Sequence, residues 1–110
     1  MSPEAEKTRR GFLEEALCQD PSNTFARYGL ALEFVNNEPV AAWAHFEYLL
    51  QHHPEYSATY YQAGAFLMKQ GRMDEARKVL ATGVEVTGQQ GKQHARSELL
   101  AALEDLEERN

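Results

Sequence analysis

The chain has 110 residues, of which 43% are hydrophobic and 25% charged, so it is expected to form one globular domain rather than a disordered segment. Its formal net charge of −6 argues against a nucleic-acid surface, because phosphate binding needs clustered lysine and arginine. The single cysteine, Cys18, excludes an internal disulfide framework, and neither a signal peptide nor a membrane span is visible, so we expect a cytoplasmic protein.

The first two predicted helices are separated by a proline. Ser2-Pro3-Glu4 has the capping hydroxyl, early proline and acid of a helix start, which predicts a leading helix over 3–20. This helix must end near Asp20-Pro21, because proline cannot continue the hydrogen-bond ladder. Ser22 or Asn23 can cap the second helix, whose apolar spacing extends to Asn36-Asn37.

Four more helices follow. Glu38-Pro39 opens the third, which stops at His53-Pro54. The fourth ends at Gly71, where glycine can take a left-handed C-terminal turn, and Asp74-Glu75 suit the first turn of the fifth. The fifth closes near Thr87-Gly88, and an apolar stripe marks a final helix that ends near residue 109. Nothing alternates as a half-buried strand would, so the predicted class is all-α with about six helices.

The chain also repeats itself. A shift of 33 aligns Leu13 with Phe46, and a further shift of 34 aligns Phe46 with Leu80. The first shift also aligns Pro21 with Pro54. A competing shift of 35 pairs two glycines but breaks the match between the prolines, so it is rejected.

The repeated residues follow a pattern of small and large positions. In the first copy a large residue precedes a small one inside the first helix. In both copies an apolar residue follows the small one about one turn later, and an alanine lies near the start of the second helix. The matching residues are Leu30, Ala31, Phe34, Ala42, Phe46 and Pro54 in the first copy, and Ala63, Gly64, Leu67, Ala76 and Leu80 in the second. The chain thereby resembles tetratricopeptide repeat proteins. Arg27 departs from the pattern, because that family usually has tryptophan there, whereas Tyr60 departs less.

The resemblance implies an α-solenoid of antiparallel helical hairpins, wound as a right-handed superhelix. One domain over 1–110 would then comprise a leading half-repeat, two complete repeats and a capping helix. The predicted boundaries are 3–20, 22–54, 55–88 and 91–109. Ala31 and Gly64 would lie where the two helices of a hairpin approach closely, opposite Ala42 and Ala76.

The first helix of each predicted repeat is apolar over more of its circumference than one buried face requires. In the resembled family such extra positions line a concave groove that binds extended or helical peptides. The candidate groove residues are Phe25, Tyr28, Leu32, Val35, Tyr61, Ala65, Met68 and Lys69. The alternative is that the final helix or local packing covers them. Contiguous apolar patches usually mark interaction sites, which favours the groove.

The sequence contains no catalytic constellation. There is neither a phosphate-cradling glycine loop nor a zinc-ligand spacing, and Cys18 has no partner base in the sequence. His45 and His52 are about two turns apart, too far to share one metal ion. We therefore predict no catalytic, cofactor or metal residues, and a scaffold that binds a protein or peptide. The alternatives are a homodimer that uses the same face and, less favoured, an enzyme.

Overall fold

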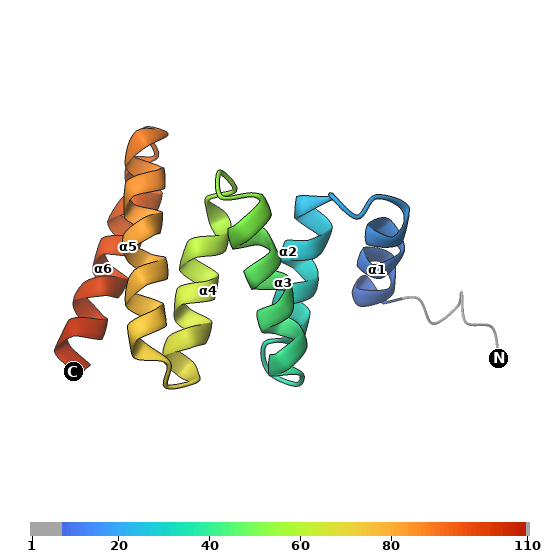
Figure 1. Cartoon of the computed structure of the whole chain (residues 1–110), viewed down its shortest axis with the longest axis horizontal. Coiled ribbons are helices and arrows are strands. Elements are labelled where there is room, and N and C mark those ends of the chain that lie inside the picture. Colours follow the sequence, from blue (N-terminus) through green and yellow to red (C-terminus); the bar gives the residue numbers. More distant parts are fainter. Residues whose placement is uncertain (1–7, 110) are drawn as a thin grey trace. The chain divides into compact units, whose positions relative to one another are not determined.

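The computed structural model describes residues 8–109, which form six helices and no strand, as the sequence predicts. Figure 1 shows the helices, coloured along the sequence. Their bounds are α1 (Arg9–Gln19), α2 (Thr24–Phe34), α3 (Pro39–His52), α4 (Ala58–Lys69), α5 (Met73–Gln89) and α6 (Gln93–Arg109). They divide into two compact units, one of residues up to His53 and one from Pro54 onward.

Capping residues set the starts of the first three helices. Thr8 accepts a hydrogen bond from the Gly11 amide at the start of α1, and the start predicted at Ser2-Pro3 lies outside the described residues. Asn23 caps α2 by accepting from the Ala26 amide at 2.9 Å, and Pro39 occupies the first turn of α3, as expected.

The helix ends also follow local chemistry. Gly71 has φ of 77° after α4, which confirms the predicted left-handed turn, and Gly91 has φ of 72° after α5. At both turns the next amide reaches back five positions, from Arg72 to the Leu67 carbonyl and from Lys92 to the Thr87 carbonyl, each at 2.9 Å. This is the Schellman arrangement, which satisfies carbonyls that the helix leaves unpaired. By contrast, α2 ends at Phe34, earlier than the predicted Asn36-Asn37.

Each unit buries the face that the repeat pattern predicts. Leu13, Phe46 and Leu80, the residues aligned by the two shifts, are all buried. In the N-terminal unit the core also includes Ala26, Leu30, Ala31, Phe34, Ala42 and Leu49. In the C-terminal unit it includes Tyr60, Ala63, Phe66, Leu67, Ala76, Leu99 and Leu106.

Each unit contains an equivalent hydrogen bond, and the pair supports the shift of 33. The Arg27 guanidinium donates to the Pro21 carbonyl at 3.0 Å, and the Tyr60 hydroxyl donates to the Pro54 carbonyl at 2.6 Å. Both donors lie six positions after the proline, and the same shift that aligns the prolines aligns the donors. Arg27 thus makes the same hydrogen bond to the preceding turn as Tyr60, although the family usually has tryptophan at this position.

Two glycines allow close packing in the C-terminal unit. A Cβ at Gly64 would lie 2.7 Å from Leu80 Cγ, so Leu80 fills the space over this glycine, whereas the sequence pattern suggests Ala76. A Cβ at Gly83 would lie 2.5 Å from Tyr60 Cβ and 3.1 Å from Leu99 Cδ1. Gly83 therefore brings α5 against both α4 and α6, which lies beside α5 in Figure 1.

Candidate functional site

One wall of the candidate site is a stripe along α4. Tyr61, Ala65 and Met68 are spaced by four and three positions, so they lie on one face of this helix, and Lys69 follows at its end. The opposite face of α4 carries the buried Ala63 and Leu67. All four candidate groove residues of this helix line the same pocket.

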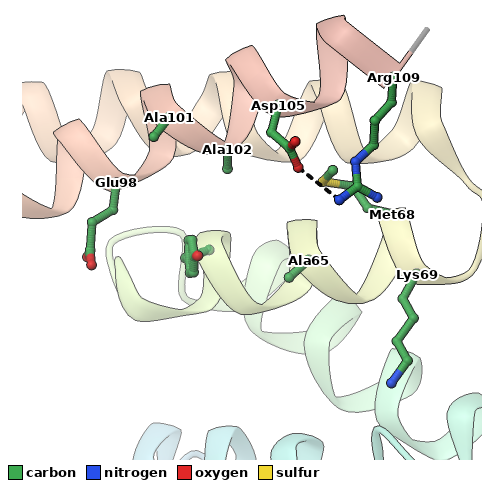
Figure 2. Close-up of a pocket in the computed structure, with 9 residues that line it drawn as sticks. Ala65, Met68, Lys69, Glu98, Ala101, Ala102, Asp105 and Arg109 are labelled. Atoms are coloured by element: carbon green, nitrogen blue, oxygen red, sulfur yellow. Dashed lines mark ion pairs between the residues drawn. The ribbon is translucent and has the colours of Figure 1, made fainter.

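The other wall is α6. Its Glu98, Ala101, Ala102, Asp105 and Arg109 recur at helical spacing and complete a pocket of about 520 Å³. Figure 2 shows Glu98, Ala102, Asp105 and Arg109 extending from α6 on the side that faces α4. On the face of α6 turned toward the core, Leu99 and Leu106 are buried. The final helix therefore does not close this part of the groove but forms one side of it.

The pocket has an apolar middle and charged ends. Ala65, Ala101 and Ala102 lie midway along it, Glu98 is at one end, and Lys69 and Arg109 are at the other (Figure 2). Within the charged end, Arg109 forms an ion pair with Asp105 at 3.1 Å. Such a site can hold an apolar surface in its middle.

The four candidate residues of the N-terminal unit lie on or directly after α2. Phe25 is 62% exposed, whereas Tyr28, Leu32 and Val35 are half-buried. The structure thus leaves an apolar side chain of this set accessible, and it places the α2 set and the α4 set in separate units.

A guanidinium group and several aromatic rings stack beside α2. The Arg27 guanidinium lies 3.7 Å from the centre of the Tyr48 ring, and one of its NH groups is 3.4 Å from His45 Nδ1. Burial first, and then the neighbouring Arg27 charge, lower the pKa of His45 below its usual 6.5, while Glu14 acts in the opposite direction. A neutral His45 ring can accept from Arg27 and stack on Phe34, whose ring centre is 5.8 Å away.

The same small-and-large pattern that builds these helices is shared with known proteins. The family model described as Tetratricopeptide repeat matches residues 36–106. The chain belongs to the tetratricopeptide repeat family. Tetratricopeptide repeat domains are generally protein–protein interaction modules and are typically non-catalytic.

Solved structures of a tetratricopeptide repeat domain protein from Salinibacter ruber have the same fold. The match to its solution NMR structure has 37% sequence identity and a TM-score of 0.75. It covers 80% of this chain and 90% of the Salinibacter ruber chain. The match to its crystal structure has 36% sequence identity and a TM-score of 0.73, and it covers 77% of this chain and 97% of the other. No curated protein matches the chain.

The part of the chain that the structure describes contains neither a group of metal-ligating side chains nor a membrane-spanning helix. Over residues 8–109, no three His, Cys, Asp or Glu side chains are grouped to hold a metal ion. None of the described helices is both long and apolar enough to cross a bilayer. Cys18 is exposed on α1.

The wall contributed by α6 is absent from the sequence-based candidates. Its acidic residues Glu98 and Asp105 line the pocket, and Glu107 accepts from Arg77 of α5 at 2.8 Å. A usable signal was present, because Glu98, Ala102, Asp105 and Arg109 recur every three or four positions beside the buried stripe.

Proposed function

We propose that this tetratricopeptide repeat chain is a non-catalytic adaptor that binds a peptide or protein segment in the groove between α4 and α6. The observation that carries the proposal is the 520 Å³ pocket with two helical walls, an apolar middle and charged ends. Concave sites that combine an apolar lining with a few polar groups are the usual form of ligand sites.

The described side chains suit binding better than chemistry. Tyr61 is 42% exposed at the start of the groove, and tyrosine offers a large contact area together with a hydroxyl at low cost in conformational entropy. In the N-terminal unit, a second apolar surface for binding is offered by Phe25, Tyr28, Leu32 and Val35. A cytoplasmic location stays a prediction from the sequence alone.

Selection from a display library of random peptides tests this function on the full chain. Ala101 is exposed and lines the groove, so Ala101→Arg should fill it without unfolding α6 and should remove binding of the selected peptides. Ala81→Arg is the matched control, because Ala81 is exposed on α5 outside the pocket lining. Selected peptides that bind wild type and both variants equally would refute the groove.

Self-association is the second candidate function. Phe25 is 62% exposed and Tyr61 is 42% exposed, and both belong to the candidate groove residues that a second copy could bury. Size-exclusion chromatography with light scattering over a wide concentration range would detect a dimer, and Phe25→Ala with Tyr61→Ala would convert it to a folded monomer. A monomer at all concentrations would reject this candidate.

A further inference from the structure

Three groups of the N-terminal unit hold the side chain of Arg27. Its guanidinium donates to the Pro21 carbonyl at 3.0 Å, lies 3.7 Å from the centre of the Tyr48 ring, and places one NH group 3.4 Å from His45 Nδ1. Arginine has donors but no acceptor, so Nδ1 must keep its lone pair for this contact, and the ring proton of His45 is on Nε2. The hydrogen bond between Arg27 and His45 therefore exists only while the imidazole is neutral.

The other charged groups near His45 offset a proton on its ring only in part. His45 stacks on Phe34, and the Arg10 guanidinium lies 4.6 Å from the centre of the same Phe34 ring, so a second arginine is close. Glu14 favours the protonated imidazole, but it is exposed and forms an ion pair with Arg10 at 3.3 Å. A proton on His45 would thus face the permanent charge of Arg27 with little compensation.

One atom of Arg27 is buried without a partner. Its Nε donates to no group among the described residues. A buried donor that has lost its hydration and gained no acceptor destabilises the arrangement that holds it. If the side chain turns outward, Nε regains water and the guanidinium moves away from a protonated His45. The Pro21 carbonyl then loses its donor as well, because one planar group makes both contacts.

The Pro21 carbonyl lies in the turn between α1 and α2, and few other contacts hold α1. Leu13 is the one buried side chain of this helix, all of whose residues the structure describes. Its ion pairs with Glu33 and Glu38 are largely accessible to solvent, and such pairs are individually weak. A helix of eleven residues is marginal in water by itself. The hydrogen bond from Arg27 therefore helps to keep α1 folded against α2.

The C-terminal unit has the equivalent hydrogen bond without a histidine beside it. Tyr60 donates to the Pro54 carbonyl at 2.6 Å, and burial raises the pKa of its hydroxyl above the usual 10. The second repeat shift, of 34, aligns His45 with Val79, which cannot take up a proton. Mild acid should therefore weaken this hydrogen bond in the N-terminal unit and leave it intact in the C-terminal unit.

We propose that His45 and Arg27 form an acid-sensitive switch. Protonation of His45 releases Arg27 from the Pro21 carbonyl and the Tyr48 ring, so that α1 opens from α2 and exposes Leu13, while the C-terminal unit stays folded. The switch does not depend on what the groove between α4 and α6 binds.

Hydrogen–deuterium exchange of the full chain at about pH 8 and about pH 5 tests the switch. Uptake is corrected for the intrinsic exchange rate at each pH, which gives a protection factor for each helix. At about pH 5, an open state in which His45 has its ordinary pKa of 6.5 gains at most about 30-fold over a closed state that binds no proton. We expect the protection of α1 to fall about 5- to 30-fold in acid, and that of α5 to change less than about twofold.

Three histidine variants identify the group that titrates. His45→Gln keeps an acceptor for Arg27 but cannot be protonated, so its α1 should be equally protected at both pH values. His94→Gln is the matched control, because the side chain of His94 is 92% exposed on α6, and it should respond as wild type does. His52→Gln changes the ring whose centre lies 4.3 Å from that of Tyr48, and it should also respond as wild type does.

Four results would overturn the switch. They are protection of α1 that does not fall in acid, an equal fall in both units, a fall that persists in His45→Gln, and a fall that His52→Gln removes. The comparison of the two units within the wild-type chain needs no variant, so it decides the question even where a substitution prevents folding.

Discussion

Gly83 lies where α5 packs against α4 and α6, so an added methyl group has no free space. The new Cβ of Gly83→Ala would lie 2.5 Å from Tyr60 Cβ and 3.1 Å from Leu99 Cδ1, closer than the roughly 3.5–4.0 Å of ordinary carbon contacts. Tyr60 cannot swing aside, because it is 2% exposed and its hydroxyl is hydrogen-bonded to the Pro54 carbonyl. The helices must therefore move apart.

The net change in the free energy of unfolding is the cost of overpacking minus the gain in helix propensity. Overpacking of this kind costs about 1–3 kcal/mol. Alanine in a helix interior recovers up to about 1 kcal/mol relative to glycine. We expect Gly83→Ala to lower the free energy of unfolding by about 0.5–2 kcal/mol, which at this chain length lowers Tm by roughly 4 °C per kcal/mol.

Gly88→Ala is the matched control on the same helix. Its added Cβ would meet only the flexible Arg96 side chain, at 3.4 Å or more, so the helix propensity of alanine should raise stability by about 0.5–1 kcal/mol. Urea denaturation followed by far-UV circular dichroism measures both variants. A midpoint for Gly83→Ala at or above that of wild type would refute the close-packing argument.

Three further variants test other contacts. Asn23→Ala removes the cap of α2 and should cost about 1 kcal/mol in urea denaturation, whereas an unchanged midpoint would deny the cap any role. Gly64→Leu places a side chain against Leu80 Cγ and should lower stability by about 1–3 kcal/mol, so an unchanged thermal midpoint would contradict this packing. Because the pKa of His45 is lowered in the folded protein, the unfolded chain binds more protons, and stability should fall as the pH drops through 6.5 toward the folded pKa. His45→Gln should lose this component of the pH dependence, and an unchanged slope would refute it.

Local signals along the chain were enough to predict where most helices begin and end. Pro39 and Gly71 act within their own turns, since proline removes an amide donor and glycine tolerates positive φ, and both are placed as predicted. The exception is the end of α2 at Phe34, because the polar residues that follow do not themselves forbid a helix.

The repeat pattern predicted the buried face but not every contact on it. Leu80 was correctly assigned to the core, yet its role as the side chain that covers Gly64 required the distance between α4 and α5. Arg27 was recognised as a departure from the family pattern, whereas its hydrogen bond to Pro21 depends on how the side chain folds back over the preceding turn. Spacing along the chain carries no information on either distance.

One wall of the candidate groove can be predicted from the sequence, whereas the other wall follows only from how the helices pack. Tyr61, Ala65 and Met68 share a face because they lie on one helix, and that periodicity is visible in the sequence. Glu98 and Ala101 are distant from them in the sequence and join them only after α5 has turned back and α6 has packed beside α4. Such a juxtaposition follows from helix packing, which depends on many weak contacts at once rather than on the pattern of any single segment.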